Sequence, residues 1–176
     1  EEVSLTMVKL TNIISGAGGA DRTALQWKNL MENPHQYDVA SRRFNLLPGL
    51  IPGSIYQRTL QLRSLYRRQV LDACERYDIL VTPSQPTPPP SIADTKKPLL
   101  SREQAMNDLK AFSFSNAAAI AGIPAISVPC GFTGDGLPVG LQIMAKRYDE
   151  ETVLRAAFAY EQNTSWHTMR PPVGDA

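Results

Sequence analysis

Two short apolar segments constrain the fold of this chain more than any other feature of its sequence. They run over residues 125–130 and 137–144, and Thr133-Gly134-Asp135-Gly136 lies between them. Glycine and aspartate are typical of tight turns because they tolerate the backbone angles that a turn requires. The pattern therefore predicts two antiparallel strands joined as a hairpin.

Apolar residues repeat at helical spacing well before this hairpin. In residues 3–14 the repeat predicts a first helix, and the glycine-rich stretch 16–19 is expected to end it. Asp21 is expected to cap a second helix, which Asn33 and Pro34 close because the residue before a proline avoids helical angles. The sequence thus predicts two separate helices before residue 34.

A long amphipathic helix follows residues 48–53, whose prolines and glycines exclude a regular helix. Ser54 is expected to cap it. Its predicted buried stripe comprises Ile55, Thr59, Leu62, Tyr66, Val70, Ala73 and Tyr77. Residues 79–83 read as a strand buried on both faces, since no polar residue alternates in its apolar run. The proline-rich run 83–98 is expected to be an extended surface loop.

The rest of the chain predicts three more helical segments. Ser101 is expected to cap a helix that runs through Phe112, and a small-residue helical segment then ends at Gly122. Asp149 is expected to cap the last helix, whose buried stripe is Val153, Ala156, Ala157 and Tyr160. Helices and strands in this order predict an α/β fold of packed layers with at least one antiparallel hairpin.

Composition limits the class of protein. The chain has 176 residues, which suits one domain, and 43% of them are hydrophobic and 20% charged. A net charge of +1 gives no field that would favour nucleic acid, and no apolar run is long enough to span a membrane. No signal peptide is expected, and two cysteines far apart in sequence favour reduced thiols and a cytoplasmic location.

No complete catalytic motif is present in the sequence. The histidines, His35 and His167, accompany no Gly-x-Ser-x-Gly pattern, and no serine has a lysine three positions on. His, Cys, Asp and Glu do not cluster at metal-ligand spacing, so neither a metal nor another cofactor is expected. From these residues alone the chain is an α/β domain without an assigned chemistry.

Several motifs nevertheless resemble the carboxy-terminal part of amidase-signature enzymes, and they occur in the family's order. Residues 122–132 read GIPAISVPCGF and residues 136–143 read GLPVGLQI. Arg63 precedes the segment 77–83, YDILVTP, at the spacing that the family shows. Further matches are ETVLR at 151–155 with AYEQ at 159–162, then Trp166-His167 and Arg170-Pro171. The likeness covers residues 55–172, about two thirds of the chain.

This resemblance implies an amidase-signature fold, in which helices cover a mixed, twisted sheet, and an enzyme that cleaves carboxamide C–N bonds. The family uses a nucleophilic serine, a bridging serine and a lysine base, with backbone amides as the oxyanion hole. All of these lie in the amino-terminal half of family members, and nothing in residues 1–176 matches that half. The chain is therefore expected to be a single partial domain, inactive alone, with no catalytic residue of its own.

By the same resemblance, the small-residue helix before the first motif would approach the substrate. The predicted substrate-binding residues on it are Phe112, Ser115, Asn116 and Ala119. Plain helix packing explains each of them equally well, since small side chains also let two backbones approach. The chain departs from the family at residues 117 and 119, both alanine here, where many members carry proline and asparagine respectively.

One subgroup of the family, the A subunit of the glutamine-dependent tRNA amidotransferase, holds glutamine with an arginine and an aspartate. Arg43 or its neighbour Arg42 could supply the arginine, and Arg43 joins the predicted substrate-binding residues. Phe112 stands at the aspartate's place, with Asp108 one turn earlier. A phenyl ring cannot pair with the ammonium group of glutamine, so a less polar amide is favoured.

Three hypotheses follow for the chain. The first is the carboxy-terminal, substrate-pocket part of an amidase, the second is the amidotransferase A subunit, and the third is a non-catalytic module that kept only the scaffold. Its expected partners are the amino-terminal half of the same enzyme and a small-molecule amide, with a homodimer left open. Neither direct contact with nucleic acid nor a membrane is expected.

Overall fold

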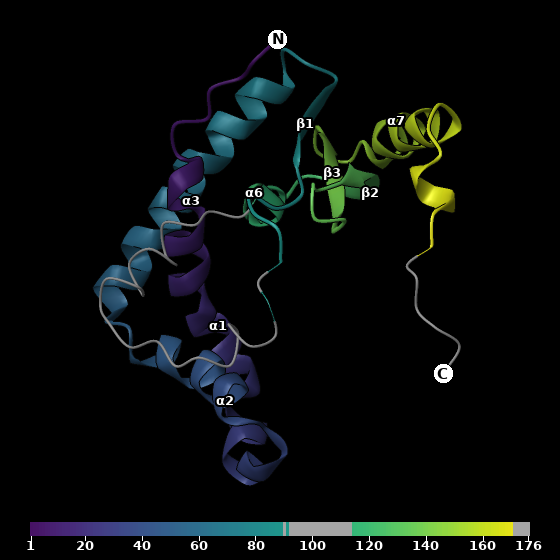
Figure 1. Ribbon diagram of the computed structural model, residues 1–176. Coiled ribbons are helices and arrows are strands. Elements are labelled where there is room, and N and C mark those ends of the chain that lie inside the picture. Colours follow the sequence, from purple (N-terminus) through teal and green to yellow (C-terminus); the bar gives the residue numbers. More distant parts are fainter. Residues whose placement is uncertain (90, 92–113, 171–176) are drawn as a thin grey trace.

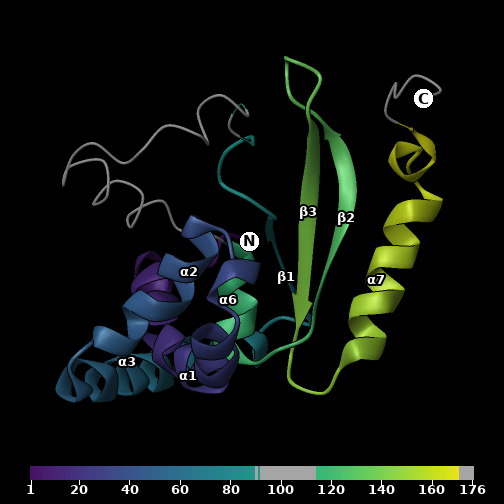
Figure 2. The same ribbon diagram turned by 90° about the horizontal axis from the view of Figure 1, so that it is seen from below.

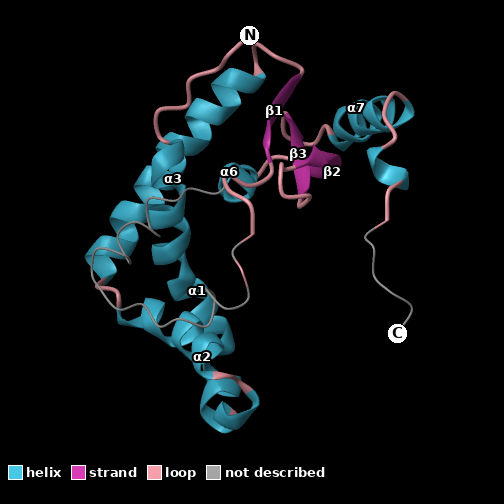
Figure 3. Cartoon of the chain, in the orientation of Figure 1, coloured by secondary structure: helices cyan, strands magenta, loops and turns pink. Residues whose placement is uncertain are grey.

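The computed structural model describes residues 1–89, 91 and 114–170, which form a three-stranded sheet with helices on both faces (Figures 1 and 3). The α-helices are α1 (Thr11–Glu32), α2 (Val39–Leu46), α3 (Gly53–Cys74), α6 (Phe114–Ala121) and α7 (Glu150–Gln162). The strands are β1 (Ile79–Pro83), β2 (Ala125–Phe132) and β3 (Pro138–Ala145). Short 3-10 helices cover Val8–Leu10, Pro34–Gln36, Leu47–Leu50 and Trp166–Thr168. The predicted α/β class is confirmed.

The sheet has the order β1-β3-β2, and both pairs of neighbouring strands are antiparallel. The predicted hairpin is confirmed: the Thr133 amide donates to the Leu137 carbonyl, and Gly136 adopts φ +79° in the turn. In this register Gln142 on β3 lies between Thr82 on β1 and Ser127 on β2. Residues far apart in sequence thus form one row across the sheet.

Each face of the sheet packs on a separate group of helices, as seen from below in Figure 2. On one face Leu80 and Met144 join a core with α1, α3 and α6, in which Tyr66 and Ala121 are fully buried. On the other face Val128 and Ile143 pack against Ala157 of α7. Alternation of side chains along the strands therefore builds two cores.

The glycine-rich stretch 16–19 does not end a helix, and this prediction was wrong. The single helix α1 continues through it, and Asp21 lies within the helix rather than at its cap. A Cβ atom on Gly19 would lie 2.8 Å from Cγ of Pro48, so the missing side chain lets residues 47–50 pack on α1. The predicted end of the helix at Asn33 is confirmed.

The predicted long helix is present as α3, but its start differs from the prediction. It begins at Gly53 after Pro52, and Ser54 makes no capping hydrogen bond. Most of the predicted stripe is buried or half-buried, whereas Ile55 in the first turn is 49% exposed. The prediction that residues 48–53 contain no regular helix is confirmed for 48–52, of which 48–50 lie in a 3-10 helix, and is wrong for Gly53, the first residue of α3.

Strand β1 has one buried face and one exposed face, which corrects the prediction of burial on both. Leu80 is buried against the helices, whereas Val81 on the opposite face is 50% exposed. Val81 is exposed because β1 lies at the edge of the described sheet, whereas α7 packs on β2 and β3. Such an edge presents unpaired backbone groups and apolar side chains together.

Other predictions fall partly outside the described residues. The helix expected from Ser101 through Phe112 lies outside them, and the proline-rich run 83–98 is described only to Pro89 and at Ser91, with no helix there. Helix α6 ends as predicted at Gly122, where φ is +68°. No helix in the described ranges is both long and apolar enough to cross a bilayer. Cys74 and Cys130 are free thiols.

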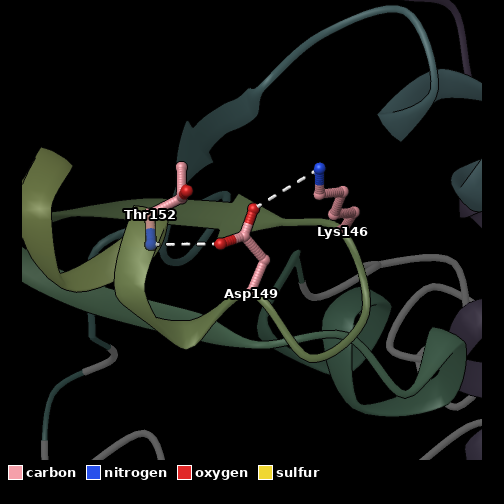
Figure 4. Close-up of polar contacts among 3 residues, drawn as sticks. All are labelled: Lys146, Asp149 and Thr152. Atoms are coloured by element: carbon pink, nitrogen blue, oxygen red, sulfur yellow. Dashed lines mark hydrogen bonds and ion pairs between the residues drawn. The ribbon is translucent and has the colours of Figure 1, made fainter.

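Asp149 caps helix α7 as predicted. Its carboxylate accepts from the Thr152 amide at 3.3 Å and lies 3.9 Å from Nζ of Lys146 (Figure 4). The hydrogen bonds from Thr152 and the nearby positive charge of Lys146 lower the pKa of the Asp149 carboxyl. Two side chains of the predicted stripe, Val153 and Ala157, are buried.

The Asp149 cap predicts a dependence of stability on pH. Because the folded-state pKa lies below the unfolded value, the ionised cap stabilises the fold above about pH 4, and this contribution disappears as the pH falls through the folded-state pKa. The variant Asp149→Asn keeps a capping side chain without the charge. In urea unfolding between about pH 3 and 6, the wild type should lose stability relative to this variant toward low pH. A constant difference would contradict the assignment.

The two glycine environments in α1 predict opposite effects of the same substitution. A Cβ on Gly16 would meet nothing within 4 Å, so Gly16→Ala should stabilise the helix by about 0.5–1 kcal/mol. Gly19→Ala forces the new methyl against Pro48 and should destabilise the protein by about 1–3 kcal/mol. Urea unfolding followed by circular dichroism measures both, and effects of the same sign would refute the proposed role of Gly19.

Candidate functional site

Helix α6 is held between the helical layer and the sheet. Ala117, Ala118 and Ala121 are buried, and their small side chains let the helix pack closely on its neighbours. Nε of Arg63 on α3 donates to the Ile120 carbonyl at 3.2 Å, near the carboxyl end of α6, where a positive charge also complements the helix dipole. Both packing and this hydrogen bond therefore fix α6 in place.

A hollow of about 360 Å³ lies between α6 and the sheet, and we call it the sheet-side hollow. Its lining comprises Ser84, Ala118, Ala119, Ile123, Ala125, Ile126, Ser127 and Gln142. Alanines on the helical wall leave the space open, while the hydroxyl and carboxamide groups come from the strands and from the residue after β1. The hollow is thus apolar on one side and polar on the other.

Ser84, Ser127 and Gln142 form the polar side of this hollow, and Thr82 supports Gln142 from outside the lining. Oγ of Ser84 lies 2.5 Å from Oγ of Ser127, and Oγ1 of Thr82 donates to Oε1 of Gln142 at 3.5 Å. Gln142 is 5% exposed, so its carboxamide is almost fully buried. Hydroxyls and a carboxamide both donate and accept hydrogen bonds without carrying charge. This surface can therefore bind a neutral polar group.

Gly140 is necessary for the contact between the two serines. A Cβ atom on it would lie 2.7 Å from Oγ of Ser84 and 2.8 Å from Oγ of Ser127. The Ser84 amide also donates to the Gly140 carbonyl at 2.8 Å, which continues the β1–β3 pairing beyond the strand. A side chain at position 140 would push the serines apart.

A second hollow of about 260 Å³ borders the other side of α6, and we call it the helix-side hollow. Unlike the first, it carries charged side chains, those of Asp21, Arg22 and Arg63. Asp21 accepts from the Tyr56 hydroxyl at 2.6 Å, and this hydrogen bond raises the pKa of Tyr56. Arg22 donates to the Phe44 carbonyl and its guanidinium lies 3.8 Å from the centre of the Phe44 ring.

The structure brings together some of the predicted substrate-binding residues. Ala119 is exposed and lines both hollows, and Asn116 lines the helix-side hollow, where its Nδ2 donates to Oδ1 of Asn12 at 3.3 Å. Ser115 lies in α6, and Phe112 lies outside the described residues. Arg43 is exposed on α2 and is not part of either lining.

Sequence reasoning missed the polar side of the sheet-side hollow. Ser127 and Gln142 belong to the family-like motifs, which predict them only as strand residues. One signal was available, because they are the polar side chains in two otherwise apolar strands. Their proximity to Thr82 and Ser84 depends on the strand register, which the sequence does not state.

Two further features of the described residues were candidates for a ligand site: another hollow and a possible metal site. A hollow of about 510 Å³ lies between residues 83–89 and the hairpin turn, and it contains none of the predicted site residues. In the ranges that the structure describes, no group of three His, Cys, Asp or Glu side chains could hold a metal ion. The groups beside α6 remain the best candidates for binding a ligand.

Comparison with known proteins identifies related chains. Residues 34–154 match the Amidase family model. Over 117 residues the chain is 44% identical to the glutamyl-tRNA(Gln) amidotransferase A subunit of Methanosarcina mazei, a match that covers 66% of this chain and 23% of that relative. The chain therefore spans about a quarter of the length of this relative.

Solved structures show the same fold. A crystal structure of an amidase superposes with a TM-score of 0.75 at 22% identity, covering 93% of this chain and 37% of that one. The 6-aminohexanoate cyclic dimer hydrolase, solved with its substrate, gives 0.75 at 20% identity, covering 98% and 39%. Both likenesses concern the fold alone. The family match extends over well more than half of the chain, and the chain belongs to the Amidase family, as its motifs indicated.

Proposed function

We propose that this chain is the carboxy-terminal, substrate-pocket and scaffold part of an amidase that hydrolyses carboxamide C–N bonds. A serine, a bridging serine and a lysine encoded upstream would carry out the chemistry, with this chain forming one wall of the pocket. The observation that carries the proposal is the family match over residues 34–154. We place the enzyme in the cytoplasm, in line with its two sparse cysteines.

Length supports the view that residues 1–176 form a partial domain. The related chains are much longer, since this one covers 23% of the Methanosarcina mazei relative and 37% of the amidase. Several large apolar side chains are also exposed, among them Leu25 at 84%, Leu50 at 78% and Val81 at 50%. Exposed apolar surface together with the edge of β1 fits a partner that covers them. The proposed partner is the amino-terminal half of the same enzyme.

The sheet-side hollow suits an uncharged amide. Ser84, Ser127 and Gln142 offer donors and acceptors that match a carbonyl oxygen and an N–H group, while Ala118 and Ala119 leave room for an apolar substituent. Charged groups instead line the helix-side hollow, with Asp21 among them. We therefore assign the substrate to the sheet-side hollow and a positioning role to the Arg63 contact with α6.

The amidotransferase A subunit is the second candidate, and the 44% identity to such a protein favours it. The two residues at the expected glutamine-binding positions argue against this candidate. Arg43 is exposed and lines neither hollow beside α6, and Phe112 occupies the place of the aspartate. A third candidate is a non-catalytic module that retains the scaffold. A homodimer remains compatible with each of the three.

The test of the proposed function compares the 176-residue chain with a longer chain that includes its upstream reading frame. The longer chain should release ammonia from benzamide and propionamide, and the 176-residue chain should not, because it lacks the nucleophile. Ammonia release by the short chain that persists after repurification would contradict the proposal. Glutamine-dependent amidation of misacylated tRNA by the longer chain would favour the second candidate, and inactivity on all substrates would favour the third.

Substitution of Ala119 tests whether the substrate lies beside this residue in the longer chain. Ala119→Leu places a larger side chain between the two hollows that Ala119 lines and should lower kcat/KM for benzamide by about tenfold or more, with a smaller effect on propionamide. The control is Ala159→Leu, the same change at another exposed helical position, on α7 away from the hollow. Equal kinetics of the two variants would remove Ala119 from the substrate pocket.

A further inference from the structure

Helix α7 carries large apolar side chains on the side that faces away from the sheet. Its inner side is buried on β2 and β3 through Val153 and Ala157. On the outer side Leu154 is 59% exposed, and Phe158, one turn later, is 63% exposed. The helix is the outermost one on its side of the sheet (Figure 2). Apolar side chains that adjoin on one exposed helix face favour a partner that covers them.

Two opposite charges lie beside these apolar side chains. Glu151 and Arg155 are both exposed on α7. Among the described residues, neither side chain forms an ion pair or a hydrogen bond, and Arg155 only adds to the positive field that lowers the pKa of Asp149. Both charges can therefore pair with groups of a partner.

A second copy of the chain fits this surface because the two charges are complementary to each other. When two α7 helices pack antiparallel about a two-fold axis, each contact between the copies occurs twice, once on each side of the axis. Glu151 of one copy can then meet Arg155 of the other in both contacts. The axis passes halfway between these residues, so the two copies of Leu154 meet beside it.

The charges favour this register over a neighbouring one. A register that places Leu154 against Phe158 of the other copy would bring Glu151 opposite Glu161, and two carboxylates repel each other. The favoured register instead places Phe158 opposite Tyr148, which is 79% exposed just before the helix. Aromatic side chains contribute strongly to small interfaces. One arrangement thus pairs the charges and the apolar side chains together.

The amino-terminal half of the proposed enzyme is expected to cover a different surface. Its contact with the sheet is expected at the edge of β1, where Val81 is exposed. A segment that extends the sheet from this edge lies in the layer of the sheet. The outer side of α7 lies one layer further out, so it stays available to a second copy.

We propose that the outer face of α7, formed by Glu151, Leu154, Arg155 and Phe158, binds a second copy of the chain in an antiparallel, two-fold symmetric contact. One helix from each copy buries less than the about 1,200 Å² of a standard stable interface, so the dimer should be weak and depend on concentration. The proposal is independent of amide hydrolysis, because it uses no residue of either hollow beside α6.

The test uses the longer chain with its upstream reading frame and measures its mass by sedimentation velocity between about 1 and 200 μM, where weak interfaces associate. The wild type should change from monomer to dimer over this range. Glu151→Arg and Arg155→Glu each replace two attractions by two repulsions, and each should raise the dissociation constant about tenfold or more. Mixed in equal amounts, the two variants should dimerise with each other as well as the wild type does, because every contact then joins an arginine to a glutamate.

The matched control is Arg68→Glu, a charge reversal at an exposed position of α3, which should leave self-association unchanged. Circular dichroism checks that each variant is folded. A wild type that stays monomeric over the whole range would overturn the proposal, and so would a dimer that neither reversal on α7 weakens. Loss of the dimer in both variants without recovery in their mixture would also overturn it, since the effect would then not come from paired charges.

Discussion

Close packing of α6 between the helical layer and the sheet is the constraint on which the rest of the structure depends. The helix contributes side chains no larger than a methyl group at Ala117, Ala118 and Ala121, so backbones rather than side chains set its distance from α3 and β3. Arg63 then fixes its carboxyl end through the Ile120 carbonyl. Because both hollows border α6, a shift of this helix would change each of them.

Much of the fold could be predicted from local patterns, and the failures have a common physical cause. The hairpin, the Gly122 helix end and the Asp149 cap depend on residues adjacent in sequence, and each is present. The predicted helix end at residues 16–19 is wrong because Gly19 allows a tertiary contact with Pro48 and does not form a turn. The predicted burial of Val81 is wrong because strand composition does not reveal which edge of a sheet stays uncovered.

The candidate site shows the same division between local and long-range information. The small-residue helix and the motifs around it pointed to Asn116 and Ala119, which do border hollows. The serine pair could not be predicted, because Ser84 and Ser127 are 43 positions apart and meet only across Gly140. Arg43 lines neither hollow for a related reason: its position in sequence says nothing about which way α2 faces.

Strand β1 also helps to fix the polar side of the sheet-side hollow. Thr82 lies opposite Gln142 in the β1–β3 register, and its hydroxyl donates to the carboxamide that lines the hollow. A shift of β1 would therefore change the hydrogen bonding of Gln142 beside α6. Because β1 is the edge of the described sheet and Val81 on it is exposed, a partner that covered this edge would contact the strand that orients Gln142.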